Sequence, residues 1–138
     1  MRHRQREIIS IADACLGGLR GRSALLIGPE EVRQSYKKLL LEAGMRVVFQ
    51  EETYSNIATL LPQVQLLLNM PEAGSVLPPL SAAEIAAGCA GRRTPLLIFD
   101  LACSTSVEEL AGLLPAVCLY TPSDLRHMLY TGADAQIA

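Results

Sequence analysis

The chain has 138 residues, of which 50% are hydrophobic and only 4% aromatic, and its formal net charge is -2 at pH 7. This length suits one domain with a sizeable core, and an aliphatic core is typical of parallel sheets covered by helices rather than of all-β folds. The charge excludes a broad basic surface for nucleic acid, and no apolar run approaches the roughly 20 residues that span a membrane. We expect one domain over residues 1–138.

Helical and strand patterns alternate along the first half of the chain. The first helix ends at a pair of glycines, Gly17 and Gly18. A short, wholly apolar run follows, as in buried parallel strands. In chain order we predict a helix at residues 7–16, a strand at 23–27, a helix at 30–43, a strand at 45–49, a helix at 55–61 and a strand at 64–68.

The second half continues the alternation. Ser81 and Glu84 have the spacing of a capping box at the start of a helix. We predict a loop at 71–79, a helix at 81–89, a strand at 95–100, a short helix at 107–113, a strand at 117–120 and a helix from Pro122. This order predicts an α/β fold: a doubly wound, mostly parallel, Rossmann-like sheet with helices on both faces and a leading N-terminal helix.

The four cysteines show neither a Cys-x-x-Cys pair nor a Cys/His spacing typical of zinc sites. With no recognisable signal peptide, we expect reduced thiols, no bound metal and a cytoplasmic protein. Cys103, after a predicted strand, is expected to be a small buried residue, with a nucleophilic thiol as the alternative. His127 is expected to be exposed, with haem or metal ligation as the alternative.

Four segments, taken in order, resemble the central nucleotide-binding domain of glutamyl-tRNA reductases, enzymes of tetrapyrrole synthesis. Residues 9–27 are similar to that family's helix, connector and first strand, and residues 30–44 to its next helix. Residues 95–102 (PLLIFDLA) resemble the motif P-x-x-x-I-D-[IL]-A, and residues 117–125 (VCLYTPSDL) resemble V-x-L-Y-D-[IL]-D-D-L. The family's catalytic and dimerisation domains have no counterpart among these segments, so the resemblance implies no catalytic residue here.

The resemblance places the family's G-x-G-x-x-G turn on Gly28, Glu30 and Arg33, so only the first glycine is kept. In such turns the second glycine admits the pyrophosphate and the third lets the helix pack closely. A carboxylate at Glu30, ~5 Å from a phosphate, would cost about 3 kcal/mol at an effective dielectric constant of ~20. We expect Glu30 and Glu31 to occupy the positive end of the helix in place of a phosphate.

A second departure follows the second strand. The Asn-Arg-Thr triplet with which the family receives the 2′-phosphate of NADPH falls on Glu51, Glu52 and Thr53. Glutamate in place of arginine reverses the charge that selects NADP, although a glutamate can bind the ribose hydroxyls of NAD. We therefore expect no cofactor, with NADP or NAD as the ligand if the altered site still binds one.

A retained scaffold with an altered site predicts a pseudoenzyme of the glutamyl-tRNA reductase type. It would act as an accessory or regulatory module in tetrapyrrole or haem metabolism, through a protein partner that is a pathway enzyme or a second copy of the chain. One alternative is a functional NAD(P)-binding reductase domain that works with a separate catalytic subunit. Another is a divergent relative of precorrin-2 dehydrogenase, which would need a catalytic aspartate and a dimerisation region.

Overall fold

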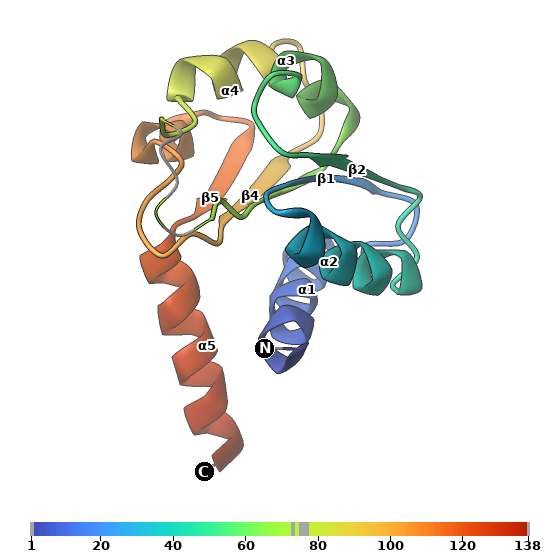
Figure 1. Ribbon diagram of the computed structural model, residues 1–138, viewed down its shortest axis with the longest axis vertical. Helices are drawn as coiled ribbons and strands as arrows, with labels where there is room; N and C mark the ends of the chain where they lie inside the picture. The colour runs from blue at the N-terminus through green and yellow to red at the C-terminus, as the bar shows by residue number, and fades with distance from the viewer. Residues whose placement is uncertain (1, 73, 75–77, 138) are drawn as a thin grey trace.

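A sheet of five parallel strands forms the centre of the computed structural model, which describes residues 2–72, 74 and 78–137 (Figure 1). The strands are β1 (Ser23–Ile27), β2 (Val47–Glu51), β3 (Leu66–Asn69), β4 (Leu96–Asp100) and β5 (Val117–Tyr120). Their order across the sheet is β2-β1-β3-β4-β5, and every pairing is parallel. The order reverses between β1 and β3, and doubly wound folds bind ligands at the carboxyl ends of the strands at such a point.

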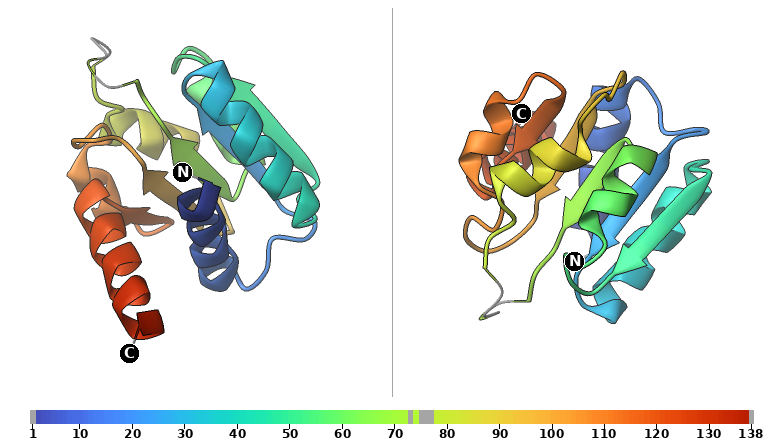
Figure 2. Two further views of the ribbon diagram at one scale, coloured as in Figure 1. Left: turned by 60° about the horizontal axis from the view of Figure 1, so that its bottom comes forward. Right: turned by 90° about the horizontal axis from the view of Figure 1, so that it is seen from above.

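Helices cover both faces of this sheet. One face carries α1 (Arg2–Leu16), α2 (Glu30–Glu42) and α5 (Pro122–Ile137). The other carries α3 (Ile57–Leu60), α4 (Ala82–Gly88) and two 3₁₀ helices, η1 (Leu61–Gln63) and η2 (Glu109–Leu113). Figure 2 shows the first face from one direction and the second from above. The predicted Rossmann-like α/β fold, with its leading helix, is confirmed.

The three inner strands are buried along their whole length, which explains their continuous apolar sequences. Successive side chains point to opposite faces. The side chains of Leu26, Leu68 and Phe99 therefore pack beneath α1, α2 and α5, whereas those of Leu25 and Leu67 pack beneath the other helices. The core has two layers of aliphatic side chains, one on each face of the sheet.

Some boundaries differ from the sequence prediction. β2 begins at Val47 rather than at residue 45 and extends to Glu51, because its last residue pairs with Ile27 of β1. The helix predicted at 55–61 is a short α-helix that continues as η1, where Pro62 lacks a backbone donor. The helix predicted at 107–113 is 3₁₀ helix η2. The loop predicted at 71–79 lies partly outside the described residues.

Candidate functional site

A cleft of about 340 Å³ opens at the carboxyl ends of β1, β2 and β3, where the strand order reverses. A smaller cleft of about 170 Å³ adjoins it towards the end of β4 and shares Tyr54, Pro71 and Glu72 with it. Rossmann-type domains bind phosphate groups at this position because the following helix presents its free amides there. This pair of clefts is the candidate site.

Gly28 brings the ends of β1 and β3 close together. A Cβ atom at this position would lie 2.4 Å from the carbonyl oxygen of Met70. The amide of Gly28 donates to the carbonyl oxygen of Glu51 at 3.1 Å, and the amide of Met70 donates to that of Ile27 at 2.7 Å. Any larger residue at position 28 would therefore push β3 away from β1, so the glycine is needed by the fold itself.

Arg33, at the position of the family's third glycine, is buried. Its Nε donates to the carbonyl oxygen of Gly28 at 2.7 Å, and its Nη1 donates to Oε1 of Gln50 at 3.2 Å. Its Nη2 lies 3.6 Å from Oε1 of Glu52, whose side chain is 77% exposed. The guanidinium thus links the turn after β1 to the end of β2, and it does not line the cleft.

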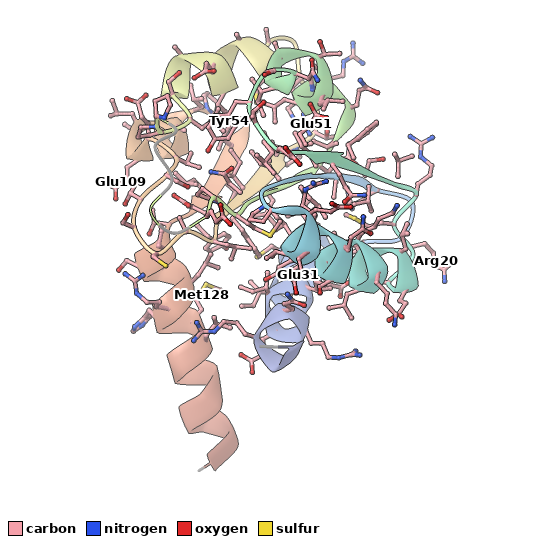
Figure 3. All side chains as sticks on the ribbon, in the orientation of Figure 1. Arg20, Glu31, Glu51, Tyr54, Glu109 and Met128 are labelled. Atoms are coloured by element: carbon pink, nitrogen blue, oxygen red, sulfur yellow. The ribbon has the colours of Figure 1, made fainter. Side chains whose placement is uncertain are left out.

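The two glutamates at the start of α2 do not cap the helix. Glu30 and Glu31 are exposed, and the N-cap residue, Pro29, makes no side-chain cap hydrogen bond. Both lie in the first turn of the helix, as expected, and that they take the place of a phosphate stays a prediction. Because both carboxylates face solvent, they act on the first turn only through charge. Figure 3 shows Glu31 at the start of α2.

The residues at the end of β2 and just after it divide between the cleft and its surroundings. Glu52 and Thr53 line the cleft, whereas the carboxylate of Glu51 turns to Asn56 and accepts a hydrogen bond of 2.6 Å from its side chain. Of the six predicted site residues, three line the cleft and three lie around it. The lining residues are Gly28, Glu52 and Thr53, and the surrounding ones are Glu30, Arg33 and Glu51.

A buried polar network beneath the clefts was not predicted. Asn69 and Asp100 end neighbouring strands in register. Asp100 accepts hydrogen bonds from the amides of Ser106 and Val107 at 2.7 and 2.9 Å, and from the Ser106 hydroxyl at 2.6 Å. Nδ2 of Asn69 donates to the Ser106 and Tyr54 hydroxyls at 2.8 and 2.9 Å. A polar residue at the end of each apolar strand was the available sequence signal.

Tyr54, labelled in Figure 3, lines both clefts and is hydrogen-bonded to Asn69 of this network. Burial raises the pKa of its phenol, an effect that the hydrogen bond from Asn69 partly offsets and the negative charge of Asp100 reinforces. The phenol is therefore neutral at physiological pH. Because its oxygen already accepts from Asn69, its own proton is available to a hydrogen-bond acceptor in the clefts.

The remaining candidates lie apart from any catalytic arrangement. Cys103 is exposed beside the smaller cleft, so the expectation of a buried cysteine is wrong; the strand before it ends at Asp100 and the loop then turns outward. His127 is exposed on α5, as predicted. Across the described ranges, no three His, Cys, Asp or Glu side chains gather closely enough to hold a metal ion. Nor does any described helix combine the length and apolar character needed to cross a bilayer.

The fold and the cleft at the strand ends define a Rossmann-type α/β domain. The chain is 26% identical to the glutamyl-tRNA reductase of Methanospirillum hungatei over 141 aligned positions, which cover 86% of this chain and 33% of that enzyme. It is thus a homologue of part of that enzyme and spans about one third of its length. No protein-family model matches the chain.

Two solved structures share the fold. Glutamyl-tRNA reductase from Methanopyrus kandleri superposes with a TM-score of 0.70 at 21% identity, over 86% of this chain and 34% of that one. The bifunctional FolD methylenetetrahydrofolate dehydrogenase/cyclohydrolase from Campylobacter jejuni superposes with a TM-score of 0.63 at 15% identity, over 91% and 44%. At these identities the likeness establishes the architecture.

The residues at the cleft do not fit a dinucleotide. The second glycine position carries Glu30, and the third carries the buried guanidinium of Arg33. The described residues that line the larger cleft include the carboxylates of Glu52 and Glu72 but neither lysine nor arginine. A pyrophosphate would therefore meet negative charge without a compensating cation.

Proposed function

We propose that this chain is a glutamyl-tRNA-reductase-like domain that has lost dinucleotide binding and acts through contact with another protein. The role would be accessory or regulatory, in tetrapyrrole metabolism. The observation that carries the proposal is the hydrogen bond from Arg33 to the Gly28 carbonyl, at the position where a dinucleotide fingerprint requires its third glycine. The homology to glutamyl-tRNA reductase supports the choice of pathway.

The chemistry around Arg33 supports this proposal. A helix can pack closely against the first strand when the third position of the fingerprint has no side chain. Here a full arginine side chain lies at this position, and its hydrogen bond to Gly28 satisfies both a buried donor and the turn carbonyl. If α2 packed as closely as a third glycine allows, this side chain would have to leave, and the buried Gly28 carbonyl would lose its partner at a cost of about 1–3 kcal/mol.

A working NAD(P)-binding reductase domain is the second candidate. It is favoured by the cleft of about 340 Å³ where the strand order reverses and by the absence of a side-chain cap hydrogen bond at the start of α2.

A relative of precorrin-2 dehydrogenase has less support. Asp100 is the buried aspartate at the end of a central strand, and its oxygens already accept hydrogen bonds from the loop at residues 102–107, so they are not available as a base.

Calorimetric titration of the whole chain with NADPH and with NADH tests the proposal. We expect no heat of binding for either cofactor up to millimolar concentration. A dissociation constant in the low micromolar range for either one would overturn the loss of dinucleotide binding and favour the reductase candidate. ADP-ribose serves as a further titrant, since it carries the pyrophosphate without the nicotinamide.

The pathway assignment needs a separate experiment. Tagged chain should be used to recover partners from its source cells, with a variant of unchanged fold but reversed surface charge as the control for non-specific capture. Specific recovery of an enzyme of tetrapyrrole synthesis is the expected result. Recovery of partners from other pathways alone would overturn this part of the proposal and leave the conclusion about cofactor binding intact.

A further inference from the structure

Two exposed thiols lie on the face of the sheet covered by α1: Cys15 contacts the hydroxyl group of Tyr120, and Cys118 precedes Tyr120 by two residues on the same face of β5. Cys15 lies one residue before the end of α1, and its Sγ is 3.3 Å from the Tyr120 oxygen, although the two residues are 105 positions apart in the sequence. The end of the first helix is thus in direct contact with the last strand, which is an edge of the sheet.

Cys118 lies on the same face of the last strand as Tyr120. Cys118 and Tyr120 are alternate residues of β5, so their side chains leave the same face of the sheet. Their partners on β4 are Leu97 and Phe99, both in the core layer that contains α1. The rings of Phe99 and Tyr120 pack edge to face with centroids 5.3 Å apart, which holds the phenol in position.

Both cysteines affect the pKa of the Tyr120 phenol. The hydrogen bond with Cys15 is the largest cause of a raised pKa at Tyr120; burial and the charges of both cysteines add to it. Tyr120 therefore stays protonated at physiological pH and can donate its proton to a thiolate beside it. The thiolate is the reactive species in exchange with disulfides.

We propose that Cys15 and Cys118 form a reversible intramolecular disulfide by exchange with a low-molecular-weight disulfide such as oxidised glutathione. The Cys15 thiolate attacks one sulfur of oxidised glutathione and releases one glutathione thiolate. The Cys118 thiolate then attacks the Cys15 sulfur of the mixed disulfide and releases the second. Both cysteines are oxidised, the two protons that their thiols lose pass through solvent, and oxidised glutathione is reduced to two thiols.

The disulfide would join the end of α1 to the edge strand β5. In the reduced protein these elements are held at this point by the contact between Cys15 and Tyr120. A covalent link across most of the chain restricts the unfolded state, so oxidation should raise the melting temperature of the domain. This modification lies on α1 and β5, away from the clefts at the strand ends, and it does not depend on whether a dinucleotide binds.

Mass spectrometry of the folded, full-length chain after incubation with oxidised glutathione tests the proposal. We expect the wild type to lose the mass of two hydrogen atoms, to keep two of its four thiols, and to yield a peptide in which Cys15 is linked to Cys118. The variants C15S and C118S should stop at a glutathione adduct on the remaining thiol. The variants C89S and C103S are matched controls and should react as the wild type does.

Tyr120→Phe tests whether the phenol hydroxyl speeds disulfide formation. The ring contact with Phe99 is kept, so the disulfide should still form, but severalfold more slowly because the donor to the thiolate is gone. Three results would overturn the proposal: wild-type protein that accumulates only glutathione adducts, a disulfide that survives in C118S, or a linkage through Cys103. Unchanged kinetics in Tyr120→Phe would overturn the role assigned to the phenol.

Discussion

Arg33 illustrates how a long side chain can serve the fold at a position where a dinucleotide fingerprint has a glycine. Its hydrogen bond to the Gly28 carbonyl is buried, whereas its ion pair reaches an exposed carboxylate, that of Glu52. Buried hydrogen bonds are costly to leave unmade, and exposed ion pairs contribute little. The two interactions of one guanidinium should therefore differ in their contribution to the free energy of unfolding.

Arg33→Met and Glu52→Gln separate these contributions. We expect Arg33→Met to lower the free energy of unfolding by about 1–3 kcal/mol, because the Gly28 carbonyl loses its donor. Glu52→Gln should change it by less than about 0.5 kcal/mol, since the Glu52 side chain is 77% exposed. Urea unfolding monitored by circular dichroism measures both. Equal losses in the two variants would contradict the assignment of Arg33's contribution to the turn.

Tyr36 gives the fold a pH dependence at the alkaline end. Burial raises its pKa to about 12, an effect slightly reduced by the nearby Arg4. In the unfolded chain the phenol ionises near its ordinary value of about 10, so the unfolded state loses its proton first as the pH rises. Stability is therefore complete below pH ~10 and falls between about 10 and 12, by roughly 2–3 kcal/mol in all.

Tyr36→Phe removes this dependence while it keeps the packed ring. We expect wild type and variant to have similar free energies of unfolding near neutral pH, and the wild type to lose more between about pH 10 and 12. Urea unfolding at closely spaced alkaline pH values measures the difference. Parallel curves for the two proteins would show that another group causes the alkaline loss.

The connection before β4 is held by hydrogen bonds from a single side chain, that of Arg92. Arg92 donates to the carbonyl oxygens of Thr94 and Pro95 in its own segment. It also donates to those of Leu61, the first residue of η1, and Val64, which follows η1. It thereby ties the segment that leads into β4 to the one that leads into β3. The adjacent Arg93 is exposed.

This neighbouring pair provides a matched test. Arg92→Ala should lower the free energy of unfolding by about 2–4 kcal/mol, because several carbonyl groups lose a charged donor together. Arg93→Ala should change it by no more than about 0.5 kcal/mol, as is usual for exposed positions. Thermal unfolding of the two variants under the same conditions compares them. A loss in Arg93→Ala as large as that in Arg92→Ala would mean that positive charge in this segment, and not the hydrogen bonds of Arg92, stabilises the region.

Elements with strong local signals could be predicted from the sequence. The strand at 23–27 and the strand at 117–120 have the predicted bounds, and the capping box of Ser81 and Glu84 is present at the start of α4. The start of β2 could not be predicted, because Met45 is apolar and buried, yet it lies before the strand. Whether such a residue pairs with β1 depends on register, which the local sequence does not determine.

At the scale of the whole molecule, local patterns predicted the layers but not the contacts between distant segments. Asp100 ends the strand predicted at 95–100 and Asn69 follows the strand predicted at 64–68. Only the register of β3 with β4 brings the two together with Tyr54 and Ser106. The loss of two glycines from the fingerprint could be seen in the sequence, whereas the hydrogen-bond partners of the Arg33 side chain could not. A long side chain at a glycine position can reach several partners, and only packing selects among them.

Restoring the fingerprint tests whether the altered residues are what prevents binding. The triple variant Glu30→Gly, Arg33→Gly and Glu52→Arg returns two glycines and the cation that the resemblance assigns to the 2′-phosphate. Because the cleft and the uncapped start of α2 are already present, we expect this variant to gain affinity for NADPH. The substitutions at positions 30 and 33 reduce helix propensity and remove the Arg33 tie, so the variant should be less stable than the wild type without ligand.

Thermal unfolding with and without cofactor shows the gain in affinity even when the triple variant is less stable than the wild type. A ligand at 100 times its dissociation constant stabilises the folded state by about 2.7 kcal/mol, so the melting temperature of the triple variant should rise clearly with NADPH while that of the wild type stays constant. NADH is the control, because the arginine introduced by Glu52→Arg would favour the 2′-phosphate, which NADH lacks. If a folded triple variant shows no response to either cofactor, the clefts themselves, and not Glu30, Arg33 and Glu52, exclude the dinucleotide.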